Sequence, residues 1–284
     1  MASPSDYLAL CLDPVHIGTG GYRLGRVDMS IVRDPATGIP QIPGTSLAGA
    51  IRAYAEQARE EDDSLPEINF VFGSIEGQAR QGMLRFYDAE IALFPVSSHL
   101  GTVWVSTLTR LQQWLGVPHG TRSDPQDEHK VIAIKGIAAT RPVHLGWLLL
   151  ETEERPAGAD RIKLPDGLSF VQRVVAVSDK LFYHLVNDHL EVRTSVEIDD
   201  ETGAAKEGHL FTYEAIPRGT IIGFQLQIDG RRANGVSATQ IEALLNRAFN
   251  YLELLGIGGM VTRGFGRLRV LPHSISPAAV GGDA

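Results

Sequence analysis

The stretch SATQIEALLNRAFNYLELLG, residues 237–256, decides the fold, because it is the clearest helix in the chain. Ser237 and Gln240 form a capping box, in which each residue satisfies a backbone amide at the start of the helix. Gly256 is a typical residue at the end of a helix. The apolar residues between them recur every three or four positions and share one face: Ile241, Leu244, Leu245, Ala248, Leu252 and Leu255. Burying each Leu or Ile stabilises by about 1.5–3 kcal/mol, so we expect this helix to pack on a sheet.

The segments around this helix predict an α+β fold. Strands are expected on both sides of it, at residues 220–228 and 266–271. Near the start of the chain, a strand at residues 7–15 precedes a second helix at residues 45–59. One helix near each end of the chain, each between strands, is typical of a split βαβ arrangement. We therefore predict a ferredoxin-like (RRM-like) core with large insertions.

Other elements are expected within the insertions and next to the second helix. That helix is expected to begin with a side-chain cap from Thr45 or Ser46. Two segments, residues 190–198 and 207–214, flank an acidic turn and predict a long β-hairpin. The densest apolar run is expected to be a buried strand. The further predicted strands, that run included, are residues 29–33, 39–42, 83–93 and 144–150.

The composition is that of a globular protein. The chain has 284 residues, of which 43% are hydrophobic and 21% charged. It contains no run approaching the roughly 20 apolar residues that cross a bilayer. It begins without the basic and apolar segments of a secretory signal. The single cysteine, Cys11, excludes an internal disulfide and fits a small core residue in a reducing compartment. We therefore expect a cytoplasmic protein without a membrane partner.

The charge is unevenly distributed along the chain. The net charge is −8, with acidic residues concentrated at residues 56–67 and 197–201. Basic residues lie instead in two glycine-rich stretches, residues 16–33 and 256–273. Because salt screens each patch beyond roughly 10 Å, a local basic surface can hold a phosphate backbone despite the net charge. The total charge therefore neither supports nor excludes an RNA partner.

The two glycine-rich loops are the candidate binding segments. Residues 16–28, HIGTGGYRLGRVD, and residues 256–266, GIGGMVTRGFG, each combine glycines with arginine. Glycine allows the backbone to approach a ligand and lets amides point at phosphates. Neither loop is a P-loop or a dinucleotide-binding fingerprint. Taken alone, residues 16–28 fit equally well a flexible connection in which Asp28 is a turn residue.

The motifs in combination carry more information than any one of them. The order of motifs resembles the RAMP superfamily, and more narrowly the repeated backbone subunit of type III-B (Cmr) CRISPR effector complexes. The resemblance covers nearly all of residues 1–271 and rests on these segments: HIGTG (16–20), VDM (27–29), IPGTSL (42–47), GAIR (49–52), FGS (72–74), LRFYDA (84–89), FPV (94–96), VSD (177–179), VRT (192–194), KEG (206–208), LF (210–211), Glu214, GG (258–259) and GFG (264–266). Residues 199–217 favour the Cmr-type subunit over its Csm-type cousin.

The resemblance implies an architecture and a set of partners. Residues 1–271 would form a single domain whose extended hairpin, about residues 193–217, is a thumb, and residues 272–284 would be a disordered tail. Copies of the chain would stack head to tail along a CRISPR guide RNA, with other effector-complex subunits at the ends. Head-to-tail contacts are heterologous and naturally build filaments. Each thumb would hold the guide–target duplex apart at regular intervals.

The resemblance also implies a reaction and its residues. Asp28 would cut the target RNA through attack of a ribose 2′-hydroxyl on the adjacent phosphate. It would act either as a general base or as the holder of a weakly bound divalent cation, Mg²⁺ or Mn²⁺. Leu210 and Phe211 would separate the bases. The implied RNA-binding residues are His16, Gly18, Arg26, Ser46, Arg52, Leu210, Phe211, Gly258, Gly259, Thr262 and Arg263.

Two departures and three alternatives accompany this interpretation. Ala48 and Arg263 stand where the family often has lysine, which puts one guide contact in doubt because Ala48 carries no charge. The chain would alternatively be a structural RNA-binding subunit that never cuts, or a Csm-type backbone subunit. A third alternative is a metal-independent endonuclease that processes guide RNA with His16 as acid or base. Single-turnover cleavage with and without EDTA separates the two cutting reactions from each other and from the structural subunit.

Overall fold

Four strands, β1, β6, β14 and β15, form the part of the sheet that positions the site. The structure is a computed structural model, and it describes residues 4–20, 27–74, 80–118, 125, 127–154, 157–198, 205–232 and 235–271. The four strands follow the order β15-β1-β14-β6. All neighbouring pairs are antiparallel. The strands are β1 (Ser5–Cys11), β6 (Ala89–Val96), β14 (Ile221–Ile228) and β15 (Leu268–Leu271).

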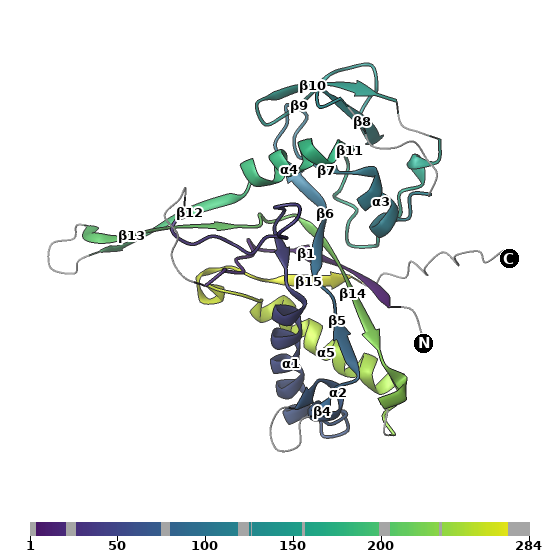
Figure 1. Ribbon diagram of the computed structural model, residues 1–284, viewed down its shortest axis with the longest axis vertical. Coiled ribbons are helices and arrows are strands. Elements are labelled where there is room, and N and C mark those ends of the chain that lie inside the picture. Colours follow the sequence, from purple (N-terminus) through teal and green to yellow (C-terminus); the bar gives the residue numbers. More distant parts are fainter. Residues whose placement is uncertain are drawn as a thin grey trace.

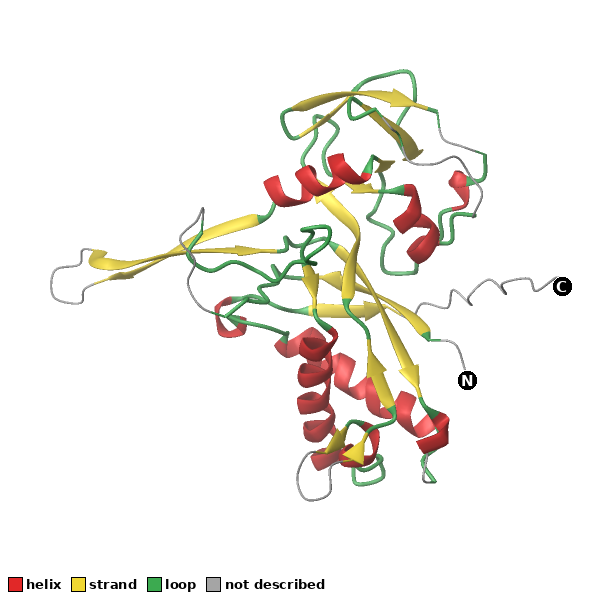
Figure 2. Ribbon diagram, viewed as in Figure 1, coloured by secondary structure: helices red, strands yellow, loops and turns green. Residues whose placement is uncertain are grey.

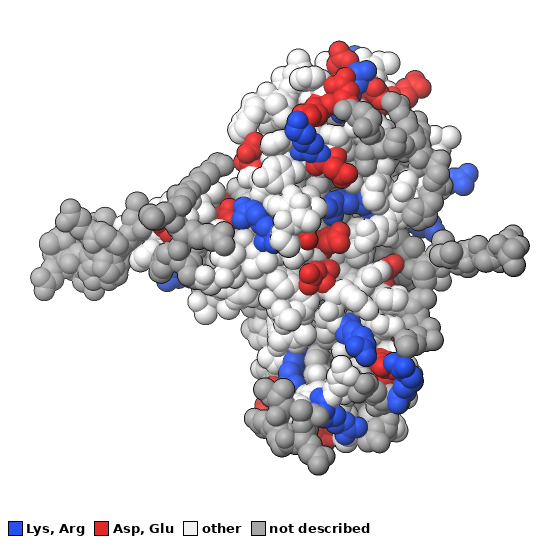
Figure 3. Space-filling view, viewed as in Figure 1, with Lys and Arg blue, Asp and Glu red and all other residues white. Residues whose placement is uncertain are grey.

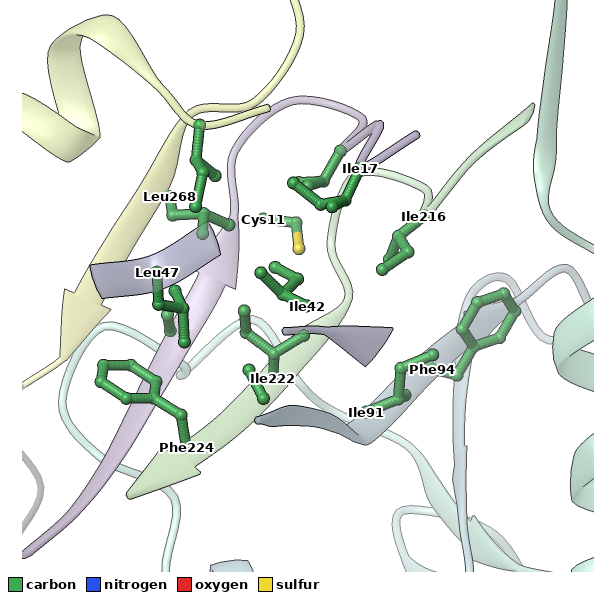
Figure 4. Close-up of a cluster of buried hydrophobic side chains, with 14 of the residues drawn as sticks. Cys11, Ile17, Ile42, Leu47, Ile91, Phe94, Ile216, Ile222, Phe224 and Leu268 are labelled. Atoms are coloured by element: carbon green, nitrogen blue, oxygen red, sulfur yellow. The ribbon is translucent and has the colours of Figure 1, made fainter. Parts of the chain in front are cut away.

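Two long helices cover one face of these strands. They are α1 (Gly44–Glu61) and α5 (Ala238–Leu255), so the chain order is β1-α1-β6-β14-α5-β15 (Figure 1). Side chains of β1 alternate between the two faces of the sheet, as a strand requires. Ala9 and Cys11 lie in the core under the helices, and Leu8 and Leu10 lie in a second core on the opposite face. Cys11 is fully buried, as predicted (Figure 4).

The sheet continues into an upper lobe. The strand order beyond β6 is β7-β11-β8-β10-β9, which completes an eleven-stranded sheet with β2 and β5 at its margins. Helices α3 and α4 pack on opposite faces of this part, through the second and first core respectively. The lobe's elements are β7 (Val103–Ser106), α3 (Leu108–Leu115), β8 (Lys130–Lys135), β9 (Val143–Leu145), β10 (Leu148–Glu153), η1 (Ala159–Arg161), β11 (Val174–Ala176) and α4 (Asp179–Asp188).

Short elements complete the lower end. A four-residue helix and a two-stranded sheet of β3 and β4 follow α1. Two further short elements lie elsewhere, because β2 pairs with β6 and η3 belongs to the second glycine-rich loop. The short elements of the chain are β2 (Gln41–Ile42), α2 (Ile68–Val71), β3 (Gly73–Ser74), β4 (Arg80–Gln81), β5 (Leu84–Phe86), η2 (Gly230–Arg232) and η3 (Val261–Arg263). In the part of the chain that the structure describes, no helix is both long and apolar enough to span a membrane.

The predicted hairpin is confirmed and protrudes from the body. It consists of β12 (Glu191–Ile198) and β13 (Ala205–Ala215), paired antiparallel as a separate two-stranded sheet. Figures 1 and 2 show it leaving the body on the left, directly after α4. Its acidic tip, residues 199–204, and the tail, residues 272–284, lie outside the described residues.

The prediction for α5 is confirmed except at its last turn. The capping box of Ser237 and Gln240 is present, and five of the six predicted apolar positions are buried. Leu255 is instead 47% exposed, and Phe249 is buried. The chain turns sharply at Gly256, with a φ of +83°, and Ile257 takes the buried position beyond the helix end.

The start of α1 corrects two predictions. Neither Thr45 nor Ser46 caps the helix, because α1 already begins at Gly44, and Asp88 Oδ1 accepts the Gly44 amide hydrogen at 2.7 Å. A Cβ at residue 44 would lie 2.5 Å from the carbonyl oxygen of Phe86. The predicted strand at residues 83–93 is therefore divided into two strands, β5 and β6. Between them, Asp88 lies outside the strands and caps α1.

The apolar run at residues 144–150 is not one buried strand. It forms a tight turn between β9 and β10, in which Gly146 has a φ of +60°. In this β9–β10 pair, successive side chains point to opposite faces, and Trp147 and Leu149 lie on the outside, 73% and 58% exposed. The dense apolar composition concealed the turn, because only Gly146 marks it in the sequence.

Candidate functional site

The two glycine-rich loops meet around His16. Gly259 donates its amide hydrogen to the carbonyl oxygen of His16 at 2.9 Å. A Cβ at Gly258 would lie 2.4 Å from that oxygen, and Cβ atoms at Gly18 and Gly259 would each lie 3.1 Å from an imidazole atom of His16. These glycines therefore permit close packing of two backbones, and the Gly259 amide is already used within the protein.

His16 is a buried anchor. Its side chain is 4% exposed, and Nδ1 lies 2.7 Å from the carbonyl oxygen of Glu214. Because a carbonyl only accepts, Nδ1 carries the proton and donates it. The ring meets Tyr213 edge-on at 6.3 Å between centroids. This burial weighs against direct proton transfer between His16 and an RNA ligand.

Residues 29–33 form isolated bridges, not the predicted strand. Met29 pairs with Tyr213, Ile31 with Gly18, and Arg33 with Pro40. A continuous ladder requires one partner strand, whereas this segment changes partner every two residues. Pro40 also has no amide hydrogen to donate. The segment therefore runs beside the root of the hairpin and joins the first loop to β13.

Asp28 is fixed to β13 by Thr212. Its Oδ2 accepts hydrogen bonds from the Thr212 amide at 2.7 Å and from the Thr212 hydroxyl at 2.8 Å. The Asp28 amide in turn donates to Thr212 Oγ1 at 3.0 Å. The amide and hydroxyl of Thr212 hold the pKa of the Asp28 carboxyl below its usual range. None of these bonds uses Oδ1, so an ionised carboxylate keeps one oxygen for a cation or a hydroxyl group.

Glu214 fixes the same segment two residues along β13. Its carboxylate accepts two hydrogen bonds from the Arg33 guanidinium, at 2.6 and 2.9 Å, and one from the Ile31 amide at 2.9 Å. Burial by itself would raise the pKa of the Glu214 carboxyl, but the Arg33 and Ile31 bonds outweigh it and lower that pKa. Thr212 and Glu214 thus hold residues 28–33 from one side of β13.

A small apolar cluster supports the other side of the hairpin root. Tyr213 and Phe265 meet edge-on at 5.5 Å, with Met29 and Met260 packed against them. The Arg193 guanidinium lies 4.6 Å from the centre of the Phe265 ring. Among the described residues, Met260 is the one non-glycine with positive φ, +64°. Such a conformation costs about 1–2 kcal/mol.

After the strained turn at Met260, the second glycine-rich loop is exposed to solvent. The turn precedes η3, and the predicted RNA-binding residues Thr262 and Arg263 are both exposed. Phe211 is half-buried on β13, two residues toward the tip from Tyr213. The side chains of Leu210 and Arg26 lie outside what the structure describes.

Two predicted RNA-binding residues lie on α1, away from His16. Ser46 is half-buried in the first turn of the helix. Arg52 donates to Glu56, to the carbonyl oxygen of Gly73 and to Asn69, on the side of α2 and β3. There it lines a pocket of about 400 Å³ together with Arg80 and Arg85. In Figure 3, basic side chains gather toward this lower end.

Comparison with known proteins assigns the family. The family model described as RAMPs, the RAMP superfamily, matches residues 9–269. The chain belongs to the RAMP superfamily. It is 29% identical over 277 residues, 91% of this chain and 92% of the relative, to the CRISPR system Cmr endoribonuclease Cmr4 of Pyrococcus furiosus.

Two solved structures share the fold of this RAMP chain. A chain of the type III-B Cmr-beta complex bound to cognate target RNA has a TM-score of 0.72 at 18% identity, covering 95% of this chain and 97% of that one. Oligomeric Cmr4 from Pyrococcus furiosus has a TM-score of 0.59 at 22% identity, covering 96% and 100%.

The RAMP motifs led to Asp28 but not to its neighbours. The motifs indicate no role for Thr212, Glu214 or Arg33, although Glu214 is among the motif residues. The available signal was their spacing, because residues 212 and 214 face the same side of a strand. No group of three or more His, Cys, Asp or Glu side chains within the described ranges is placed to hold a metal. Asp28 Oδ1, which the bonds from Thr212 do not use, fits a cation that takes most of its ligands from elsewhere.

Proposed function

We propose that this chain is the repeated backbone subunit of a type III-B CRISPR ribonucleoprotein in the cytoplasm, and that it cuts the target RNA bound to its guide. Membership of the RAMP superfamily and similarity over most of the chain to a Cmr endoribonuclease support this proposal. The observation that carries it is the Asp28 carboxylate, which two hydrogen bonds from Thr212 fix at the root of a protruding hairpin.

The proposed architecture is a ferredoxin-like palm with a thumb. The order β1-α1-β6-β14-α5-β15, the strand order β15-β1-β14-β6 and two helices on one face support the palm. The hairpin β12–β13 would be the thumb, and copies would stack head to tail along the guide RNA. The crystallised oligomeric Cmr4 with the same fold is consistent with such stacking.

The proposed reaction is an internal displacement in the target RNA. The ribose 2′-oxygen bonds to the adjacent phosphorus and loses its proton, while the bond to the 5′-oxygen breaks and that oxygen gains a proton. The products are a cyclic phosphate and a 5′-hydroxyl. Holding the duplex apart beside the thumb would align the attacking oxygen, a contribution of position.

The lowered pKa of the Asp28 carboxyl favours a role in holding a cation over a role as a general base. A carboxylate with a lowered pKa is a weak base, because catalytic bases work best with a pKa near the working pH. A hard cation such as Mg²⁺ takes one or two carboxylate oxygens and completes its shell with water and phosphate oxygens. Asp28 Oδ1 fits that need. Such a cation would neutralise developing negative charge on the phosphate.

Asp28→Asn tests this function. The complex reconstituted with this variant should bind guide and target as before but cut about 10²–10⁴-fold more slowly under single-turnover conditions. The amide keeps the size of the carboxylate and loses its charge. Asp34→Asn is the matched control, since Asp34 is another loop aspartate whose pKa the Thr37 bonds lower, yet it only closes the turn at residues 34–38.

Three outcomes discriminate the alternatives. Cutting by Asp28→Asn at the wild-type rate would make Asp28 a structural turn residue. Cutting by wild type that persists in EDTA would point to the metal-independent guide-processing enzyme. A wild-type complex that binds target and never cuts would be the structural subunit.

A further inference from the structure

Thr212 and Asp28 hold each other reciprocally although they are 184 positions apart in sequence. The Thr212 hydroxyl donates to Asp28 Oδ2 at 2.8 Å and accepts from the Asp28 amide at 3.0 Å. The Thr212 amide adds a second bond to the same oxygen at 2.7 Å. Two bonds converging on Oδ2 define the direction in which the other carboxylate oxygen points.

The backbone around this pair is fastened independently. The Met29 amide donates to the Thr212 carbonyl oxygen at 3.0 Å, and the Glu214 amide donates to the Met29 carbonyl oxygen at 3.2 Å. The ion pair between Arg33 and the buried Glu214 holds the segment further along. The Thr212 hydroxyl is therefore not needed to keep residues 28–33 beside β13, which leaves orientation of the carboxylate as its specific contribution.

We propose that Thr212 is a positioning residue, which orients the Asp28 carboxylate and makes the root of the hairpin part of the cutting site. This inference rests on the proposed function, since Thr212 acts only through Asp28. It goes beyond that function by assigning the orientation to a residue of the hairpin instead of the glycine-rich loop.

The placement has a consequence for where the chain cuts. Phe211, a proposed base-separating residue, precedes Thr212 on β13, and adjacent residues of a strand lie about 3.3 Å apart along it. Successive side chains point to opposite faces, so Phe211 faces the Tyr213 side and Thr212 faces Asp28. No loop intervenes between the residue that would separate bases and the residue that orients the carboxylate. The distance along the RNA between the bases that the thumb separates and the bond that is cut would therefore be fixed.

Thr212→Val, Thr212→Ser and Thr194→Val test the inference in the reconstituted complex. Valine keeps the β-branched shape of the strand residue and removes the hydroxyl, whereas serine restores the hydroxyl. Thr194 lies opposite Thr212 in the hairpin, is exposed, and makes no bond to Asp28, so it is the matched control. The readouts are the single-turnover rate at saturating target and the affinity for target.

We expect Thr212→Val to cut about 10–100-fold more slowly with unchanged affinity, since a shift of about 1 Å in a reacting group costs on that order. Thr212→Ser and Thr194→Val should stay within about threefold of wild type. A Thr212→Val rate equal to wild type overturns the inference. A Thr212→Ser rate as low as that of valine also overturns it, because the hydroxyl would then not be responsible.

A second measurement covers a complex that fails to assemble. The pKa of the Asp28 carboxyl in the purified chain, followed by carbon NMR, should rise in Thr212→Val because the hydroxyl bond that lowers it is gone. An unchanged pKa overturns the inference. Asp28→Asn in the same series separates the two failures: if it cuts normally, the proposed function fails; if it is inactive while Thr212→Val cuts normally, only the role of Thr212 fails.

Discussion

Glu214 is a buried carboxylate at the root of the hairpin, and Arg33 supplies its counter-charge. Its carboxylate is buried and accepts three hydrogen bonds, two of them from Arg33. Leaving one member of a buried charged network without its partner costs more than the bonds contribute, because the remaining group stays desolvated. Glu214 therefore links the position of residues 28–33 to the protonation of one side chain.

Glu214→Gln should lower the free energy of unfolding at neutral pH by about 1–3 kcal/mol, since Arg33 loses its counter-charge. The folded-state pKa of Glu214 lies below its unfolded value, so the stabilisation is present above about pH 4.3 and is lost as pH falls through the folded-state pKa. Wild type should therefore lose more stability than the variant between pH 7 and about pH 3. Denaturant unfolding of the purified chain at several pH values measures both effects.

Glu253→Gln is the control for that comparison. Glu253 also pairs with an arginine, Arg269, but both side chains are partly exposed, and exposed pairs contribute only about 0–1 kcal/mol. Its effect should be small at every pH. Parallel pH curves for wild type and Glu214→Gln would contradict a role for Glu214 in acid sensitivity.

The resemblance pointed to Asp28 as the candidate residue but not to the residues that hold it. Residues 16–28 show a glycine-rich loop that ends in a carboxylate, a local pattern that by itself fits a turn residue equally well. The partner Thr212 is an ordinary strand residue whose importance depends on pairing across 184 positions. The burial of His16 could not be predicted from the sequence either, because it depends on how Gly18 and Gly259 of the two loops pack around the imidazole.

Among the elements, the hairpin is fastened to the body at its root by the bonds that the described residues make. Met29 pairs with Tyr213, and Thr212 and Glu214 bind residues 28–33, all within the last four residues of β13. Residues nearer the tip contribute nothing to these bonds. A hairpin so attached can lose its tip without moving the carboxylate of Asp28.

Replacing residues 199–206 by Asn-Gly, a typical two-residue hairpin turn, tests whether the tip sets the spacing of cuts. We expect the shortened chain to stay folded and bound to RNA, because surface hairpin tips tolerate change. Cutting should persist while the regular interval between cut positions disappears. Gel analysis of the products from a long target measures the interval.

A chain in which residues 199–206 are scrambled at constant length is the control, and it should keep the interval. Sharp, evenly spaced cuts from the shortened chain would show that the tip plays no part in setting the distance between sites. The root would then be sufficient to define it.

Elements with local signals were predictable, and those shaped by long-range pairing were not. The boundaries of α5 follow from a capping box and a glycine within its own sequence. The cap of α1 comes from Asp88, 44 positions away, whereas the local pattern favours Thr45 or Ser46. The strand predicted at residues 29–33 failed for a related reason, since its partners lie in three separate segments.

On the face shown in Figure 3, several basic side chains gather toward the lower end, with acidic side chains among them. Two of the arginines predicted to bind RNA, Arg52 and Arg263, lie in different settings on the molecule. Arg52 already donates to Glu56 and to two other groups, whereas Arg263 is exposed on the strained second loop. Arg263 is thus the freer cation for a phosphate.

Arg263→Ala should reduce the salt dependence of RNA binding more than Arg52→Ala does. Removing one cation that binds a phosphate of a single strand lowers the slope of log K against log salt concentration by about 0.7. We expect close to that change for Arg263→Ala and less for Arg52→Ala, because Glu56 offsets part of the Arg52 charge. Arg269→Ala, which removes an arginine paired with Glu253, should leave the slope unchanged. Binding titrations of unrelated RNA sequences from low to high salt measure all three slopes. A double Arg52→Ala, Arg263→Ala variant with the wild-type slope would place the RNA path elsewhere, and Arg80 and Arg85 beside the lower pocket would be the next cations to remove.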